Sequence, residues 1–206
     1  PIVAACGAPV AKLSGRGLGV SGGTIDKLES IPGFSCHLSE EQFRDQVEKV
    51  GIAIIEAGNL APADKEIYAL RDTTGTVDSL PLIGSSIVSK KVATGAGHLL
   101  YDVKRGSGAF MKTTEEAREL AGLLVRLSED LGIHASALIT DMHNPLGSAV
   151  GNALEVRESV LLLKNEPVPD DLARKVNHVA TRLLELKGIS DPEHAVENAL
   201  SSGTAY

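Results

Sequence analysis

A chain of 206 residues is long enough for one large domain with a substantial buried core, and its 43% apolar and 23% charged residues are ordinary for a soluble globular protein. The net charge of −7 and the aromatic content of 3% argue against a nucleic-acid-binding protein, which would carry a broad basic face and aromatic platforms for bases. No segment approaches the roughly 20 uninterrupted apolar residues of a membrane span, so we expect neither a nucleic acid nor a membrane as a partner.

The cysteines indicate the compartment. Cys6 and Cys36 fit no metal-ligand spacing, and one pair in a chain of this length is no disulfide framework. We therefore expect two reduced thiols in a cytoplasmic protein. The chain opens at Pro1 without an initiator Met and ends at Tyr206 directly after a helical pattern, so we expect a segment of a longer polypeptide. A mature chain with a processed start is the alternative.

Short apolar runs with β-branched residues alternate with helical patterns. The runs cover residues 2–5, 51–57, 99–103 and 133–140. This alternation predicts an α/β fold with a mixed, mostly parallel sheet and flanking helices. Capping boxes at Ser39 and Thr113 predict the starts of two helices. Later patterns predict helices over residues 170–186 and 192–201.

Residues 62–92 show helical patterns only, although they lie between two predicted strands. Pro81 suits the first turn of a helix that continues to Lys91, because proline lacks the amide that this turn leaves unbonded. A purely helical stretch between the strands of an α/β chain indicates an insertion. We therefore expect these residues to belong to a neighbouring helical domain.

A glycine-rich segment runs from Lys12 to Thr24 and contains five glycines. Glycines allow successive backbone amides to converge on one anion, because no Cβ atom stands in the way. The hydroxyl groups of Ser14 and Thr24 can add donors, and Lys12 supplies a positive charge. The spacing matches neither a P-loop nor a dinucleotide-binding fingerprint. The segment predicts an anion site, and a merely flexible loop is the alternative.

A second group of polar residues lies in the helical stretch. Ser86 and Lys90 are four residues apart, so they share one face of a helix. Together with Arg71 they would present two cations and a hydroxyl group. The alternative is a solvated helix face on which Arg71 pairs with the adjacent Asp72.

Two further blocks follow predicted strands. Residues 102–111 form a glycine-containing turn, and residues 141–147 lead into a helix that carries Glu158. In an α/β sheet the carboxyl ends of the strands line the ligand crevice, so both blocks are candidates for a site. His143, with Asp141 two residues away, is more typical of a structural histidine than of a metal ligand.

Taken in order, these blocks resemble the thymidine/pyrimidine-nucleoside phosphorylase family. The motifs that carry the resemblance are Ser14–Gly19, Gly22–Phe34, Leu60–Lys65, Tyr68–Asp72 and Thr76–Ile83, followed by the blocks at 102–111 and 141–147. The resemblance covers essentially the whole chain.

The resemblance implies an enzyme, a glycosyltransferase (pentosyltransferase) of pyrimidine nucleoside salvage. Such an enzyme reversibly converts uridine, thymidine or deoxyuridine and phosphate into the free base and a pentose 1-phosphate. It uses phosphate as co-substrate and no organic cofactor, and it works as a homodimer. Family members continue beyond both ends of this chain, so we expect the chain alone to be inactive.

The resemblance also assigns residues. It implies that phosphate is bound by Lys12, the Leu13 backbone, Ser14 and Thr24. It implies that the base is bound by Arg71, Ser86 and Lys90, of which Arg71 and Lys90 are catalytic. It also implies that K⁺ is bound by the carbonyls of Leu146 and Ala149 and by Glu158. It implies an incomplete α/β phosphate-binding domain over residues 1–62 and 93–206. Residues 63–92 would be a helical segment of a second, all-α domain that lacks its N-terminal part.

The chain departs from the family pattern at a few positions. Val20 replaces the usual His of the phosphate loop, Arg105 replaces a small apolar residue, and His143 with Asn144 replaces Asn-Gln. At position 12, Lys12 is the residue typical of the family branch that accepts several pyrimidine nucleosides. One alternative is an anthranilate-type phosphoribosyltransferase, which would require an acidic pair for Mg²⁺, and the sequence contains no Asp-Glu dipeptide. The other alternative is a non-enzymatic binding domain.

Overall fold

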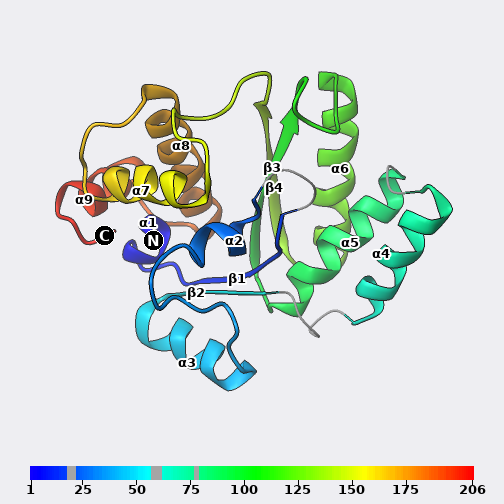
Figure 1. Ribbon diagram of the computed structural model, residues 1–206, viewed down its shortest axis with the longest axis horizontal. Helices are drawn as coiled ribbons and strands as arrows, with labels where there is room; N and C mark the ends of the chain where they lie inside the picture. The colour runs from blue at the N-terminus through cyan, green and yellow to red at the C-terminus, as the bar shows by residue number, and fades with distance from the viewer. Residues whose placement is uncertain (18–21, 57–61, 77–78) are drawn as a thin grey trace. The chain divides into compact units, whose positions relative to one another are not determined.

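The computed structural model describes residues 1–17, 22–56, 62–76 and 79–206 (Figure 1). These residues form two compact units, which we describe separately. Unit 1 comprises Pro1–Ala57 and Gly147–Tyr206, and unit 2 comprises Gly58–Leu146. None of the helices in the described ranges combines the length and the apolar composition needed to cross a membrane.

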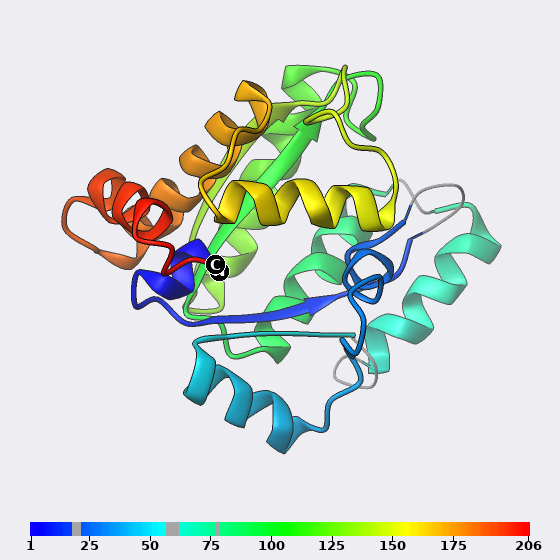
Figure 2. The same cartoon turned by 60° about the vertical axis from the view of Figure 1, so that its left-hand side comes forward.

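Unit 1 contains one pair of parallel strands and six helices among its described residues. The elements are α1 (Ile2–Ala5), β1 (Val10–Ser14), α2 (Thr24–Leu28), α3 (Glu40–Val50), β2 (Ile52–Glu56), α7 (Asn152–Leu163), α8 (Asp170–Lys187) and α9 (Pro192–Ser201). The register places Val10 opposite Ile52 and Ser14 opposite Glu56. Helix α3 covers one face of the pair, where Phe43 packs against buried residues of both strands (Figure 2).

A second core in unit 1 joins its remaining helices. Leu184 of α8 is fully buried and packs with Leu162 of α7, Val196 of α9 and Ile2 of α1. The prediction of a strand over residues 2–5 is therefore wrong, because these residues form helix α1. A run of four apolar residues fits a buried helical turn as well as a strand, and only packing against other helices decides between them.

Unit 2 contains the other parallel pair. Its elements are α4 (Pro62–Thr74), α5 (Leu80–Ala93), β3 (His98–Arg105), α6 (Thr114–Asp130) and β4 (His134–Asp141). The register places His98 opposite His134 and Arg105 opposite Asp141, and α6 connects the two strands (Figure 1). The predicted α/β architecture with flanking helices is confirmed, while both described strand pairs are parallel rather than mixed.

The core of unit 2 lies between α6, α5 and β3. Leu124 of α6 packs with Tyr101 and Val103 of β3 and with Val88 of α5. The Tyr101 hydroxyl lies 2.8 Å from the Oγ atom of Ser128, which is also fully buried, so the polar end of the tyrosine is satisfied inside the core. Helix α5 shares this core with β3. The separate helical domain expected over residues 63–92 stays a prediction.

The local signals in the sequence correspond to observed structure. Both capping boxes are present: Ser39 Oγ accepts a hydrogen bond from the Gln42 amide at 3.2 Å, and Thr113 Oγ1 accepts one from the Glu116 amide at 3.2 Å. Pro81 lies in the first turn of α5, as predicted. Both cysteines are free thiols, and that of Cys36 is buried.

Candidate active site

The three residues predicted to hold a base line one pocket in unit 2. Arg71 comes from α4, and Ser86 and Lys90 come from α5. The pocket has a volume of about 470 Å³, within the usual range for small-molecule sites. Its other walls are largely apolar and include Ile83, Ile87 and Leu120. The pocket thus combines a few convergent polar groups with apolar walls, as a site for a flat heterocycle requires.

Two of the three polar residues are deeply buried. Arg71 is 4% exposed and its Nη1 atom donates a hydrogen bond to the Leu82 carbonyl at 3.3 Å. Ser86 is 7% exposed, and its Oγ atom accepts a hydrogen bond from Lys90 Nζ at 3.1 Å. The helical spacing of Ser86 and Lys90 therefore produces the contact that the sequence predicts. Charges held in this way do not need to reorganise when a ligand arrives.

Asp64 is a site residue that the analysis of the sequence did not single out. Its Oδ2 atom lies 2.7 Å from Lys90 Nζ, and its side chain is only 9% exposed. The carboxylate holds the ammonium group where α4 packs against α5. Because the two residues are far apart in sequence, no local spacing predicts the pair.

The glycine turn after β3 forms one edge of the pocket. The Gly106 amide donates to the Met111 carbonyl at 3.0 Å, and Lys112 Nζ donates to the Ala109 carbonyl at 2.6 Å, so the turn is closed by its own backbone. Phe110 lines the pocket while remaining 82% exposed. Gly106 has a φ of +129°, and a Cβ atom there would lie 2.8 Å from the ring of His143. Both conditions require glycine.

His143 has a structural partner. Its Nδ1 atom lies 2.6 Å from Asp141 Oδ1, and Arg105 Nη2 donates to the same oxygen at 3.0 Å. The imidazole holds the pKa of Asp141 below its usual value, mainly through this hydrogen bond. In the described part of the chain, no group of three His, Cys, Asp or Glu residues is arranged to hold a metal ion.

In unit 1, the residues predicted to bind phosphate lie at the two ends of the glycine-rich segment. Lys12 is exposed, Leu13 is buried and Ser14 ends β1, whereas Thr24 begins α2. Leu13 lies opposite Ile55 in the strand pair, and the role that the resemblance implies for its backbone stays a prediction. Residues 18–21 lie outside the described residues, and the Val20 departure is among them.

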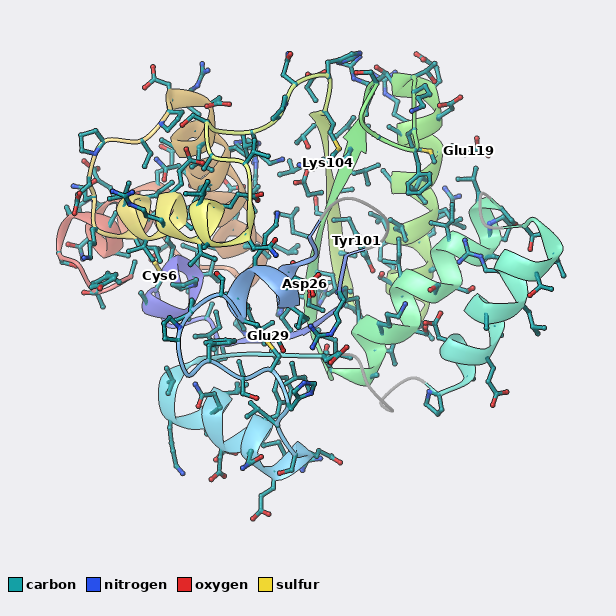
Figure 3. All side chains as sticks on the ribbon, in the orientation of Figure 1. Cys6, Asp26, Glu29, Tyr101, Lys104 and Glu119 are labelled. Atoms are coloured by element: carbon teal, nitrogen blue, oxygen red, sulfur yellow. The ribbon has the colours of Figure 1, made fainter. Side chains whose placement is uncertain are left out.

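The carboxylate of Asp26 closes this segment. Asp26 Oδ2 accepts hydrogen bonds from the amides of Gly17 at 2.7 Å and Gly23 at 2.9 Å, so one oxygen joins the two sides of the loop. Figure 3 labels Asp26 on α2. These two amides converge on a carboxylate of the chain itself, and the predicted site for a bound anion stays a prediction. The bond from Gly17, followed by that from Gly23, lowers the pKa of Asp26. A Cβ atom on Gly23 would lie 2.4 Å from the Gly17 nitrogen, so this approach requires glycine.

Arg16 supports the same closure. Its Nη1 atom lies 3.1 Å from Asp26 Oδ1 and 2.7 Å from Glu29 Oε2, and its Nε atom lies 3.3 Å from Glu56 Oε1. These carboxylates raise the pKa of Arg16, and the guanidinium in turn lowers the pKa of Glu29. Although Arg16 is one of the two cations of the segment, its donors serve carboxylates of unit 1.

A further ion pair connects the last turn of α2 with the first turn of α7. Lys27 Nζ donates to Glu155 Oε2, and this contact is the main cause of the lowered pKa of Glu155. Both side chains are about one-third exposed. The pair fixes the helix that follows the glycine-rich segment.

Glu158, one of the residues predicted to bind K⁺, is a buried carboxylate that the preceding loop of unit 1 contacts. Glu158 is 8% exposed, and its Oε1 atom accepts hydrogen bonds from the Ser148 amide at 3.0 Å, the Ser148 hydroxyl at 2.8 Å and the Ala149 amide at 3.2 Å. Gly147 has a φ of +72°, and a Cβ atom there would lie 2.4 Å from Glu158 Oε2. Leu146 is the last residue of unit 2. The loop therefore closes on Glu158, and K⁺ binding stays a prediction.

Comparison with known proteins identifies the relatives. A family model described as "Glycosyl transferase family, a/b domain" matches residues 1–206. The chain is 54% identical over 205 residues to "Thymidine phosphorylase" of Mycobacterium tuberculosis, and the aligned region covers 100% of this chain and 47% of that protein. It is 53% identical over 192 residues to "Pyrimidine-nucleoside phosphorylase" of Bacillus subtilis, which covers 93% and 44%. A protein of the same name from Geobacillus stearothermophilus is 48% identical over 210 residues, which cover 100% and 48%. The chain spans about half the length of these relatives.

Replacement of Asp26 by alanine should release the glycine-rich segment. Peptides that contain Gly17 or Gly23 should exchange amide hydrogen faster, because both amides lose their acceptor. Mass spectrometry of hydrogen–deuterium exchange measures this change. The control is Asp45→Ala, which removes an exposed carboxylate of α3 whose ion-pair partner is Lys49.

The pH dependence of this protection has a definite sign. The hydrogen bonds from Gly17 and Gly23 to Asp26 form a clamp on the segment. Because the pKa of Asp26 is lowered in the folded state, this clamp contributes to the stability of the fold at neutral pH and throughout the range above about 3.9, the ordinary pKa of aspartate. Its contribution falls as the pH drops from that value through the lowered pKa. Equal exchange in Asp26→Ala and wild type at pH 7 would contradict the clamp.

Proposed function

The chain belongs to the glycosyl transferase family whose a/b domain matches it throughout, and we propose that the protein containing it catalyses the reversible phosphorolysis of pyrimidine nucleosides. One observation carries the proposal: Arg71, Ser86 and Lys90 converge on a single pocket with apolar walls. Those are the residues to which the family resemblance assigns the base. The phosphorylase names of the relatives favour this reaction over that of an anthranilate-type phosphoribosyltransferase or a non-enzymatic binding domain.

The reaction places negative charge on the base. A phosphate oxygen forms a bond with C1′ of the pentose while the glycosidic bond breaks, and the electron pair of that bond remains on the base. The charge spreads to the carbonyl oxygens of the pyrimidine, and the released base then takes up a proton. Arg71 and Lys90 stabilise this charge, which is larger in the transition state than in the bound nucleoside. Ser86 satisfies the polar imide edge.

Burial strengthens this contribution. Arg71 is almost completely removed from water, so its attraction for a developing anion is screened less than at a surface. Lys90 is held by Asp64 and by Ser86, which orient its ammonium group. The pocket therefore supplies fixed positive charge to the leaving base.

The residues that the resemblance assigns to the phosphate nucleophile belong to unit 1. Lys12, the Leu13 backbone, Ser14 and Thr24 bind the phosphate, and the Asp26 clamp and Arg16 keep the segment that carries them closed. Orientation of the phosphate reduces the entropic part of the barrier. The proposal includes a cytoplasmic homodimer with a pyrimidine nucleoside and phosphate as its small-molecule partners.

The chain's own residues suit a bound alkali cation. Carboxylate and carbonyl oxygens are the ligands that hard cations prefer, and Glu158 with the carbonyl groups of Leu146 and Ala149 would supply them. A bound K⁺ would compensate the buried negative charge of Glu158 and hold the loop that precedes α7.

Phosphate-dependent release of the base tests the function. The full-length protein should release uracil from uridine and thymine from thymidine only when phosphate is present. The 206-residue chain alone should show less than a tenth of that turnover, because partial orientation of the nucleophile forfeits much of a contribution worth up to about 7–11 kcal/mol. Comparable turnover by the isolated chain would contradict the expectation that this chain alone is inactive.

Replacement of Arg71 or Lys90 by alanine in the full-length protein should lower kcat/KM by roughly 10²–10³, as loss of one oxyanion donor does. Arg71→Lys should not restore activity, because an ammonium group cannot reproduce the planar guanidinium. The control is Arg118→Ala, an exposed cation of α6 that lies 3.9 Å from Glu115. A kcat/KM of Arg71→Ala near that of the wild type would exclude a role for Arg71 at the leaving base.

Thermal unfolding tests the cation site without an activity measurement. At equal ionic strength, KCl should raise the Tm of the full-length protein above its value in LiCl, because a ligand that binds only the folded state stabilises it. Glu158→Gln should abolish this difference, whereas Glu166→Gln, at an exposed position after α7, should retain it. No difference between KCl and LiCl for the wild type would rule out a K⁺-specific site.

A further inference from the structure

Helix α7 contacts the short helix that begins at Thr24. Asn152 and Glu155 carry the contacts, and because they are three residues apart they share one face of α7. Glu155 Oε2 accepts a hydrogen bond from Lys27 Nζ of α2, and Glu155 Oε1 accepts one from the Gly151 amide at 3.2 Å. Within unit 1, α2 therefore packs directly on the first turn of α7 (Figure 1).

The second contact is made to the glycine-rich segment itself. The Asn152 side chain lies so close to Gly22 that a Cβ atom on this glycine would lie 3.0 Å from Asn152 Cγ and would overlap Asn152 Oδ1. Gly22 comes before Thr24 in the chain, and Lys27 comes after it. Two contacts from one turn of α7 therefore bracket a residue that is proposed to bind phosphate.

The two ends of this segment have different supports. Ser14 ends β1 and lies opposite Glu56, so strand pairing fixes its position. Thr24 begins a helix of five residues, which is too short to be stable without packing. Helix α7 supplies such packing, and α7 is itself anchored in the core of unit 1 by Leu162. The position of Thr24 relative to Ser14 therefore depends on α7 as well as on the Asp26 clamp.

A purely stabilising role explains the pair of Lys27 and Glu155 less well. Both side chains are about one-third exposed, and water screens an ion pair at that exposure. A bound phosphate, by contrast, requires donors that are held at defined positions before it arrives. The location of the pair, one helical turn from Thr24, is therefore the informative feature.

We propose that Asn152 and Glu155 are positioning residues for the phosphate site, which hold α2 so that Thr24 and Ser14 converge on the same anion. This inference rests on the proposed function. Glu155 acts through Lys27 and Asn152 acts through Gly22, so neither residue contacts the phosphate.

The sign of one substitution separates positioning from simple electrostatics. Glu155→Gln removes a negative charge and leaves Lys27 without this carboxylate. By charge alone, the variant would bind an anion more tightly than the wild type does. Loss of positioning has the opposite effect, because Thr24 is then no longer held relative to Ser14.

Calorimetric titration of the full-length protein with inorganic phosphate tests the role. Glu155→Gln should weaken phosphate binding by roughly 3–10-fold, within the range of coupling between residues of one network. Its uridine affinity should change by less than about twofold, because the residues proposed to hold the base lie in unit 2. Asn152→Ala, a neutral change, should give a smaller loss of the same kind. The control is Glu185→Gln, which breaks an exposed ion pair with Arg182 on α8 and should leave both affinities unchanged.

Exchange of the two charges provides a second test. Lys27→Glu and Glu155→Lys should each weaken phosphate binding, because like charges would then face each other between α2 and α7. The double variant restores an ion pair with its ends reversed, and its phosphate affinity should return to within about threefold of the wild type. Losses that add up in the double variant would overturn the inference.

The outcomes separate the inference from the proposed function. Unchanged or tighter phosphate binding in Glu155→Gln, or an equal loss of uridine affinity, would overturn the positioning role. Asn152→Ala keeps the test decisive if Glu155→Gln does not fold. Binding does not require turnover, so a wild-type protein whose phosphate binding depends on Glu155 but that releases no base would count against phosphorolysis alone. Phosphorolysis by the wild type with unaltered phosphate binding in both variants would count against positioning alone.

Discussion

Both strand pairs in the described part of the chain are parallel, so the segment that joins the two strands must return along their whole length before the second strand begins. Helix α6 does this between β3 and β4, and α3 does it between β1 and β2. This connection places the carboxyl ends of both strands at the same edge of each pair. The glycine-rich segment after β1 and the glycine turn after β3 both begin there. In unit 1 this constraint puts Ser14, at the end of β1, next to the glycine-rich segment, whereas Arg71, Ser86 and Lys90 of unit 2 come from α4 and α5.

A second feature is that most cations near these ends already have carboxylate partners. Lys90 pairs with Asp64, Lys27 with Glu155, and Arg16 with several acidic residues of unit 1. Such pairing fixes the position of a charge and also reduces the net attraction for a passing anion. In the proposed reaction, the contribution of such a fixed charge is largest when negative charge develops on the leaving base.

The sequence predicts local structure better than it predicts partners. The capping boxes at Ser39 and Thr113 are correct because each depends on residues three positions apart. The contact between Ser86 and Lys90 follows equally from helical spacing. The strand predicted at residues 2–5 is wrong because a short apolar run has no period of its own, and its packing against α8 and α9 decides its structure.

The candidate site shows the same division. The sequence offered Arg71 as a companion of Ser86 and Lys90, and the resemblance to a known family assigned it to the base. No spacing predicts that the three residues meet, because α4 and α5 come together only when the chain folds. Asp26 was missed for a related reason. Its partners Gly17 and Gly23 lie within ten residues, but a carboxylate in a helix says nothing about which amides it accepts until the loop is closed. Glycine content indicated that loop amides converge, and only the geometry shows that two of them bond to Asp26.

The contact among Arg105, Asp141 and His143 has an evolutionary consequence. Two of these residues are departures from the family pattern, and both hold the same carboxylate oxygen. A substitution at one position therefore changes the charge and the hydrogen bonding at Asp141 that the other residue contacts. Because the two side chains share one partner, we expect the effects of substituting them to be non-additive. Exchange of this turn between related enzymes should succeed when both residues are transferred together.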